Sequence, residues 1–476
     1  MPSSRRSWAA HSTERRSEKS PFIDNQPPHD RIPRAVSTSP SDTPTRRTHF
    51  VDLAPFRRSP AFFRLWLGGL IAGIGGQMTV IAVGLHIYDI TGSTTAVSLV
   101  GVFALVPMIV AGVYGGVLAD SFDRRTVVLV AEFLAWGSTV GLALLAWNGI
   151  DELWMFYALT TITAVATTVI GATRSAIVPR LLSPELLPAA SALGGISFGV
   201  QVTVGPALAG VLVATVGFQW TYTVDVILFV AAFTGVVTLP RIIPEGGSRR
   251  AGFAAVWEGL AFLKRAPNIR MSFLIDIVAM TFGMPRVVFP AVGALLIGGG
   301  AITVGILSAA FAVGALLSSV FSGRLGHVRL QGRAIARAVA VYGAFIGAFG
   351  LVLLVMDHDR SGGITSSFDD ANLPALALAS LALAGAGASD NVSSIFRQTM
   401  MQSAVPDVMR GRIQGVFTVV VTGGPRLGDA YVGLAAATAL LWLPPLLGGA
   451  IVVLFSLAAV RLHRSLREYD SLAPTP

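Results

Sequence analysis

The stretch that joins two long apolar segments near residue 120 reads Gly115-Gly116-Val117-Leu118-Ala119-Asp120-Ser121-Phe122-Asp123-Arg124-Arg125. Its glycines allow two helices to approach closely before a tight turn. Asp120 follows the predicted end of a helix, where the helix dipole disfavours an anion, so Arg124 and Arg125 are the local compensating cations. The turn either only fixes topology or acts as a conformational latch between helices. The candidate latch residues are Gly116, Asp120, Arg124 and Arg125.

The composition of the chain predicts a membrane protein. Of its 476 residues, 53% are hydrophobic and 13% are charged, and the mean hydropathy is +0.68, whereas soluble proteins carry about 25% charged residues. The chain has no cysteine, which excludes disulfides, thiolate metal sites and thiol catalysis. The first apolar run begins after residue 60 and is too long for the core of a cleavable signal peptide.

Apolar segments of roughly twenty residues, the length that spans a bilayer, alternate with short breaks from residue 61 onward. We therefore predict an all-α integral membrane protein with twelve transmembrane helices in two pseudo-symmetric six-helix halves. The predicted spans are 61–85, 96–118, 126–147, 153–173, 188–214, 220–240, 270–297, 303–325, 335–356, 374–396, 412–434 and 440–462.

Positive charge decides the predicted orientation. Arginines fall in every second break or at the tail, among them Arg124, Arg174, Arg241, Arg397 and Arg464, and Arg360 is the exception. The positive-inside rule then puts both termini in the cytoplasm of a multi-pass protein. The net charge of +9 is explained by this topology, so we expect no nucleic-acid partner.

Five regions follow from these spans. We expect a disordered cytoplasmic N-terminal tail over 1–58, because it is too polar to offset its ordering entropy. A first half over 59–240, a cytoplasmic linker over 241–269, a second half over 270–463 and a cytoplasmic C-terminal tail over 464–476 complete the chain. The linker contains a segment, Phe253–Leu263, with the apolar spacing of an amphipathic helix.

The two halves read as repeats. Gly116-x-Leu118 recurs as Gly323-x-Leu325, and Pro184-Glu185-Leu186-Leu187 recurs as Pro406-Asp407-Val408-Met409. Transporters with such repeats bind substrate between the halves, near the bilayer midplane.

The opening stretch resembles the loop signature of the major facilitator superfamily, Gly-x-Leu-x-Asp-Arg-x-Gly-Arg-Arg. Ser121 and Asp123 depart from it, replacing the usual Arg and Gly. The second half is similar to the enterobactin (catecholate siderophore) exporter branch, which lies close to the third drug:proton antiporter group with its macrolide and tetracycline pumps. The resemblance covers about residues 50–465 and rests on Met284–Ala291, Ser322–His327, Gln398–Pro406, Gly411–Gly415 and Gly428–Ala430.

Ionisable residues inside spans are costly and are functional candidates by default. Arg426 and Asp429 lie three apart on one helix face, and Asp429 is also the expected partner of Arg286. Their contact is either an ion pair that holds the second half together or a pair that opens during transport. The candidates for proton coupling or substrate binding are Asp276, Arg286, Asp390, Arg426, Asp429 and Gln77.

The superfamily resemblance implies that the first, fourth, seventh and tenth helices line a cavity. Asp276 and Asp390 would then face water and titrate, and the alternative is helix packing or capping. Glu132 is expected to join the cytoplasmic charge cluster of Arg124, and Asp225 is expected near the outer end as a packing residue.

The fifth span contains Gly205-Pro206-Ala207-Leu208-Ala209-Gly210. It resembles the Gly-Pro-x-x-Gly-Gly motif of antiporters, which makes Gly205, Pro206 and Gly210 candidate motif residues. Gln201 and Ala209 stand where that motif has glycine. Threonines and aromatics along the fourth span would suit a large aromatic or polyhydroxylated solute, or they pack helices together.

No Gly-x-x-x-x-Gly-Lys-Ser/Thr loop is present, so a gradient must supply the energy. One charge that crosses 100 mV supplies about 2.3 kcal/mol, and tenfold accumulation of a neutral solute costs about 1.4 kcal/mol. We therefore expect a secondary transporter that works by alternating access. The family resemblance implies that it is a monomer in the bacterial cytoplasmic membrane, with lipid around it, and that it exports a siderophore in exchange for protons.

The alternative is a multidrug efflux pump that confers antibiotic resistance, and a metabolite importer is a further one. No catalytic constellation appears in the sequence, so we expect no enzyme activity, no cofactor and no metal.

Overall fold

The computed structural model describes residues 52–243, 253–321, 328–358, 368–436 and 440–475, and every regular element in these ranges is a helix. By its internal contacts the chain divides into Met1–His49 and Phe50–Pro476, and all described residues belong to the second unit. The predicted disordered tail therefore lies outside the described residues up to residue 51. The last residues of the predicted tail form a short helix, α1 (Ala54–Arg58).

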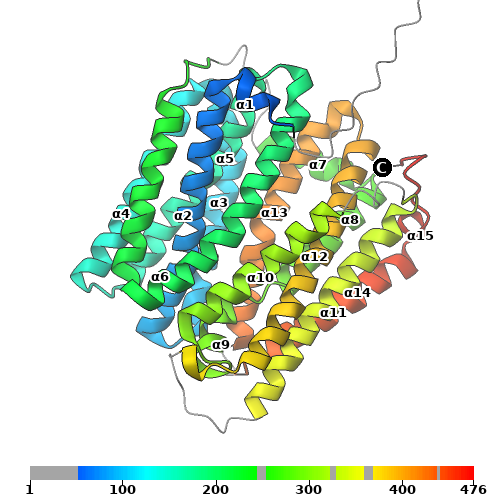
Figure 1. Ribbon diagram of the computed structural model, residues 1–476. Coiled ribbons are helices and arrows are strands. Elements are labelled where there is room, and N and C mark those ends of the chain that lie inside the picture. Colours follow the sequence, from blue (N-terminus) through cyan, green and yellow to red (C-terminus); the bar gives the residue numbers. More distant parts are fainter. Residues whose placement is uncertain (1–51, 244–252, 322–327, 359–367, 437–439, 476) are drawn as a thin grey trace, which may run out of the picture. The chain divides into compact units, whose positions relative to one another are not determined.

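Five long helices form the first half of the described unit (Figure 1). They are α2 (Pro60–Thr91), α3 (Thr94–Ser121), α4 (Arg124–Asn148), α5 (Leu153–Leu181) and, after the short η1 (Pro184–Leu186), α6 (Leu187–Val237). Polar side chains begin three of them: Ser59 accepts from the Phe62 amide of α2, Ser93 from the Ala96 amide of α3, and Asp123 from the Arg125 amide of α4.

The second half follows after α7 (Phe253–Leu263), which coincides with the predicted amphipathic helix. Its elements are α8 (Pro267–Phe282), η2 (Arg286–Val288), α9 (Phe289–Leu295), α10 (Gly300–Val320), α11 (Gln331–His358), η4 (Phe368–Asp370), α12 (Leu373–Ala404), α13 (Asp407–Ala436), α14 (Leu443–Leu462) and α15 (Arg464–Arg467).

The predicted spans fall on these helices, with residues 322–325 of the eighth outside the described part. Among the described residues, ten helical segments are long and apolar enough to cross a membrane. One of them, Pro184–Val237, holds two predicted spans. The predicted eleventh span lies on α13, which is not one of the ten and which carries Arg412, Arg426 and Asp429.

Glycines with positive φ mark one end of the bundle. Among the described residues they are Gly92, Gly149, Gly217, Gly298, Gly299 and Gly300, and all lie where one helix turns into the next. We call this the Gly92 end, and the opposite end, where α2 and α4 begin, the Arg124 end. In Figure 1 the α1 helix and the C-terminus both lie at the upper, Arg124 end.

The halves meet along two helix pairs, α3 with α13 and α6 with α10. At the Gly92 end the Thr95 hydroxyl donates to the Gly433 carbonyl at 3.1 Å. A Cβ on Gly210 would collide with the Ala301 carbonyl and Gly305 of α10, so the backbones there touch directly. Small residues make such contacts possible in a membrane, and they close the Gly92 end.

The antiporter-like motif, Gly205 to Gly210, therefore packs against two other helices, one on each side of α6. Gly210 and the Pro206 carbonyl face α10, while Gly205 packs against the backbone of α2 and against Gln77. Gln77 is half-buried at this crossing.

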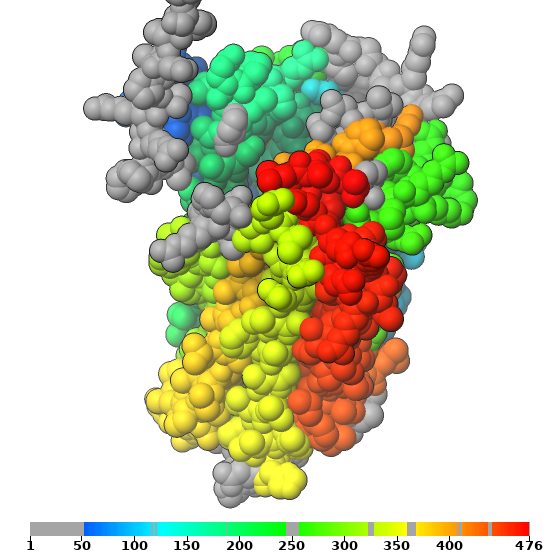
Figure 2. Space-filling view, turned by 90° about the vertical axis from the view of Figure 1, so that its right-hand side faces the viewer, coloured from blue at the N-terminus to red at the C-terminus, as the bar shows by residue number. Residues whose placement is uncertain are grey.

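The last residues of the chain pack onto the second half, as Figure 2 shows for the red C-terminal segment beside the yellow-green start of α11. Arg329 pairs with Asp470 at 2.5 Å, and the Ser471 amide donates to the Arg329 carbonyl at 3.0 Å. The hydrogen bond from Arg329 holds the pKa of the Asp470 carboxyl below its usual value. Asn268 on α8 donates to the Thr475 carbonyl at 3.1 Å.

The turn inside α6 gives a first prediction. Gly217 has φ 80° and ψ 178°, a region that is essentially restricted to glycine, so Gly217→Ala should destabilise the protein by about 1–3 kcal/mol. Thermal unfolding in detergent should show a lower Tm. The control is Gly171→Ala in α5, where an added Cβ meets nothing within 4 Å and helix propensity improves. Equal Tm values for the two variants would contradict the strain argument.

Candidate functional site

Arg286, Arg426 and Asp429 form one charge cluster, as the sequence led us to expect. Arg286 donates to both carboxylate oxygens of Asp429, from Nε to Oδ1 at 3.0 Å and from Nη2 to Oδ2 at 2.8 Å. Arg426 Nη1 lies 3.3 Å from Oδ2. The Asp429 side chain is 4% exposed, so the carboxylate depends on these two cations for its stabilisation.

A break in the seventh predicted span positions Arg286. Helix α8 ends at Phe282, and Pro285 cannot continue it because proline lacks an amide hydrogen and clashes with the preceding turn. The Tyr342 hydroxyl donates to the free Gly283 carbonyl at 2.5 Å. The chain resumes at η2, whose first residue is Arg286. Broken helices of this kind surround binding and coupling sites in transporters.

The cluster lies at the contact between the halves. A cavity of about 70 Å³ is lined by Val80, Gly84 and Val97 from the first half and by Arg286, Arg426 and Asp429 from the second. A Cβ on Gly101 of α3 would collide with the Asp429 side chain. The cavity has room for only a few waters, so this site seals the Gly92 end and does not hold an organic solute in this conformation.

A second cluster joins Asp276, Asp390 and Arg397. Arg397 Nη1 lies 2.9 Å from Asp276 Oδ1, and its Nη2 lies 3.7 Å from Asp390 Oδ1. The expectation that both acids face water is wrong for Asp276, whose side chain is 1% exposed, while that of Asp390 is 33% exposed. The physical reason is Arg397, which lies two helical turns after Asp390 on α12 and covers Asp276 of α8.

The second cluster has more acid than base. Both carboxylate oxygens of Asp276 and the Nε and Nη1 of Arg397 are buried without a hydrogen bond in the described part of the chain. With both acids ionised the three groups carry a net charge of −1, and one proton on either acid makes them neutral. Acids that share one arginine in this way titrate as a unit.

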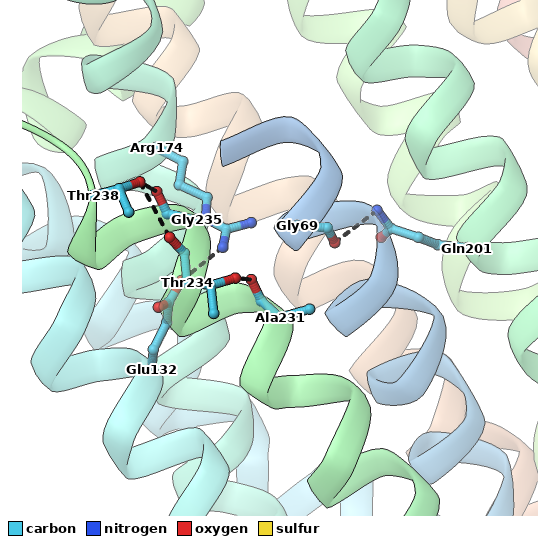
Figure 3. A network of polar contacts seen from close by, with 8 residues as sticks. All are labelled: Gly69, Glu132, Arg174, Gln201, Ala231, Thr234, Gly235 and Thr238. Carbon is cyan, nitrogen blue, oxygen red and sulfur yellow. Dashed lines mark hydrogen bonds and ion pairs between the residues drawn. The ribbon is translucent and has the colours of Figure 1, made fainter. Parts of the chain in front are cut away.

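Glu132 has a different partner from the one we expected. It pairs with Arg174 of α5 at 2.6 Å (Figure 3), and not with the charge cluster of Arg124. Arg124 donates to the Ala119 carbonyl at 3.1 Å and to the Ala176 carbonyl at 2.8 Å. Glu132 lies two turns inside α4, at the level where α5 presents Arg174, and so it cannot stay at the surface with Arg124.

Hydrogen bonds to backbone groups hold the turn between α3 and α4. Arg125 Nη2 donates to the Val237 carbonyl at 2.7 Å, and Asp123 accepts from the Ile242 amide at 2.9 Å. Asp123, where the superfamily signature has glycine, therefore ties the start of α4 to the segment after α6. The Asp120 side chain and the surroundings of Gly116 lie outside the described part of the structure.

Asp225 lies deeper than expected. The Thr79 hydroxyl donates to its Oδ2 at 2.5 Å, and Gly75 leaves room for its Oδ1. Both partners come from the middle of α2, so Asp225 does not lie near the outer end. It is 1% exposed, which agrees with a packing role.

Two functional candidates were missed in the sequence. Arg397 and Arg174 were both assigned to cytoplasmic breaks, but each lies within a helix and pairs with a buried acid. For Arg397 a signal was present, because it lies one residue after the predicted span 374–396, and a helix that continues to it places it two turns from Asp390 on the same face. Among the described residues no group of three His, Asp or Glu side chains is placed to hold a metal ion.

Comparisons with known proteins agree with this architecture. The family model described as transmembrane secretion effector matches residues 51–476. The enterobactin exporter of Citrobacter koseri is 26% identical over 448 residues, which cover 90% of this chain and 98% of that protein. The enterobactin exporter of Shigella boydii is 27% identical and covers 82% of this chain and 88% of that protein.

Solved structures share the fold at low identity. An auto-inhibited peptide transporter of the POT family superposes with a TM-score of 0.67 at 13% identity, covering 87% of this chain and 99% of that one. A bacterial homologue of the iron transporter ferroportin, in an inward-facing state, superposes with a TM-score of 0.56 at 16% identity, covering 83% of this chain and 98% of that one.

Proposed function

The chain belongs to the transmembrane secretion effector family, and from this premise we propose that it exports a catecholate siderophore across the bacterial cytoplasmic membrane in exchange for protons. The proposal makes it a secondary transporter that alternates between two conformations. In the conformation described here the Gly92 end is closed by direct backbone contacts between α6 and α10.

The similarity to enterobactin exporters supports the substrate. It extends over 98% of the Citrobacter koseri protein, so it includes both halves. Because the similar curated proteins are siderophore exporters, the multidrug alternative is not favoured.

The Asp276–Arg397–Asp390 cluster is the main support for the proposed proton coupling. Its acids lie on α8 and α12, and Asp390 is partly exposed while Asp276 is buried. One proton neutralises the cluster, and loss of that proton restores a net negative charge that a buried site tolerates poorly. The protonation state therefore changes the free energy of packing α8 against α12, which is what coupling a proton to a conformational change requires.

The Arg286–Asp429–Arg426 cluster is the proposed outer gate. Opening the Gly92 end must separate α13 from α3, where Asp429 packs against Gly101.

The Arg124 end is the proposed cytoplasmic end, because its arginines follow the positive-inside rule. There Glu258 of α7 pairs with Arg412 of α13 at 2.8 Å. We propose that the Arg124 turn acts as a latch at that end and that a monomer suffices for transport.

A host strain that lacks its own enterobactin exporter provides the test. Expression of this chain should restore secreted enterobactin under iron starvation, and Asp390→Asn should reduce secretion at least tenfold because the cluster then no longer gains and loses a proton at that acid. Ser389→Ala is the matched control, since the Ser389 hydroxyl donates to the Gly385 carbonyl of its own helix. If the wild-type chain leaves secretion as low as in the strain without it, the substrate assignment is wrong. If Asp390→Asn secretes as much as the wild-type chain, this coupling site is wrong.

A further inference from the structure

A second, larger cavity lies within the first half, toward the Arg124 end. It encloses about 290 Å³ between α2, α5 and α6, with Glu132 of α4 also in its wall. On α2 its wall includes two glycines four positions apart, Gly69 and Gly73. None of the groups assigned above to proton coupling or to the outer gate lines it.

Two polar side chains reach this face of α2 from its two sides, as Figure 3 shows for Arg174 and Gln201 around Gly69. A Cβ on Gly69 would collide with Arg174 Nη1, and a Cβ on Gly73 would collide with the Gln201 amide. Positions four apart on a helix are about 5–6 Å apart. The guanidinium and the amide therefore approach the same face of α2 at neighbouring positions.

Arg174 has its charge neutralised by Glu132, but not all of its hydrogen-bond donors are used. Glu132 Oε1 accepts one bond from Arg174 Nη2 at 2.6 Å, and the Glu132 side chain is 1% exposed while that of Arg174 is 23% exposed. Glu132 Oε2 and Arg174 Nε are buried without a hydrogen bond among the described residues. The ion pair therefore has zero net charge, and these two atoms have acceptor and donor capacity that no described group uses.

The remaining walls are apolar and aromatic. Phe62, Trp66 and Phe229 line the cavity, and the Trp66 indole N–H is already used by the Leu193 carbonyl at 2.9 Å. Gln201 donates to the Ser197 hydroxyl at 2.9 Å and to the Gly69 carbonyl at 3.3 Å, which holds its amide in place. A cavity with apolar walls and a few fixed polar groups is the usual form of a small-molecule site.

We propose that this cavity binds one neutral hydroxylated aromatic ring, a phenol or catechol unit, of the exported solute. The inference rests on the proposed export function for the identity of that solute. The volume is at the lower limit of ligand sites, about 300 Å³, and so it takes one ring and not a whole siderophore. A hydroxyl group both accepts from Arg174 and donates to an acceptor, whereas an anion would add uncompensated charge beside Glu132.

Two probes of the same ring size but different charge test this cavity. Ligand-observed NMR titrations of the purified protein in lipid nanodiscs at pH 7 should show at least fivefold tighter binding of catechol, which is neutral, than of benzoate, which is an anion. Glu132→Gln preserves the shape of the side chain but leaves Arg174 without its counter-charge. Benzoate affinity should therefore rise about tenfold in this variant, with catechol affinity little changed. An unchanged preference would overturn the proposal.

Substitutions at two adjacent glycines test the position of the binding site without changing the ion pair. An added Cβ on Gly194 or Gly195 meets nothing within 4 Å, so both tolerate a larger side chain, but of the two only Gly194 lines the cavity. Gly194→Leu should weaken catechol binding at least tenfold, and Gly195→Leu should leave it unchanged. Equal binding by the two variants would overturn the proposal.

Failure of this inference is distinguishable from failure of the proposed function. If the chain restores enterobactin secretion in the host strain but binds catechol equally in both glycine variants, the ring site is wrong and the export function remains. If Gly194→Leu weakens catechol binding and Gly195→Leu does not, but secretion is not restored, the ring site remains and the siderophore assignment is wrong.

Discussion

Replacing Arg397 with methionine is expected to destabilise the protein by about 3–5 kcal/mol, the cost of leaving a buried charge without its partner. Asp276 is 1% exposed and Arg397 is its ion-pair partner at 2.9 Å. Methionine fills the same volume but supplies no charge. The free energy of unfolding, measured by denaturant titration in mixed micelles, should show the loss directly.

A double variant separates loss of charge from loss of packing. Combining Arg397→Met with Asp276→Asn removes both members of the pair and should recover more than half of the lost stability. Arg464→Met is the matched control, because Arg464 is 81% exposed in its pair with Glu468 and exposed pairs contribute little. If the double variant is as unstable as Arg397→Met alone, the ion pair is not the reason for the destabilisation.

Asp429→Asn is expected to abolish export, with a loss of at least 100-fold. Asparagine retains the shape that packs against Gly101, but it leaves Arg286 and Arg426 as two unpaired cations beside a cavity of about 70 Å³. Their repulsion acts between η2 and α13, beside the place where α13 packs against α3. The Gly92 end should then no longer stay closed.

The absence of cysteine from the chain makes this loss of closure measurable. Val97 lines the small cavity and is 8% exposed, so Val97→Cys should resist a membrane-impermeant maleimide in the otherwise unchanged protein. Adding Asp429→Asn should increase its labelling rate at least tenfold. Glu152→Gln, which removes an exposed acid at the same end of the bundle, is the control and should leave labelling slow. Slow labelling together with intact export in Asp429→Asn would contradict the gate.

The sequence was sufficient wherever the deciding interaction is local or lies between the chain and its solvent. Runs of about twenty apolar residues must form helices in a bilayer because their backbone groups have no other partner there, and the predicted spans fall on the described helices. The pairing of Arg426 with Asp429 follows from a separation of three residues on one helix. The break at Pro285 was missed, because the span 270–297 was predicted as continuous, although the chemistry of proline explains the break.

The interactions between helices were decided only by the tertiary structure. Glu132 is eight positions from Arg124, the expected cluster, but forty-two from Arg174, its actual partner. Asp276 and Arg397 belong to helices that are separate in sequence, and which faces of α8 and α12 meet depends on packing that the sequence does not display.

Helix rotation and crossing are set by close contacts such as Gly387 of α12 against the Phe311 carbonyl of α10 and Gly448 of α14 against the Phe282 carbonyl of α8. A glycine in the sequence shows that a close approach is possible, but it does not show which helix approaches. The sequence by itself therefore determined the membrane class, the helices and the local ion pair. The tertiary structure decided which acid meets which arginine, because that choice depends on the relative rotation of packed helices.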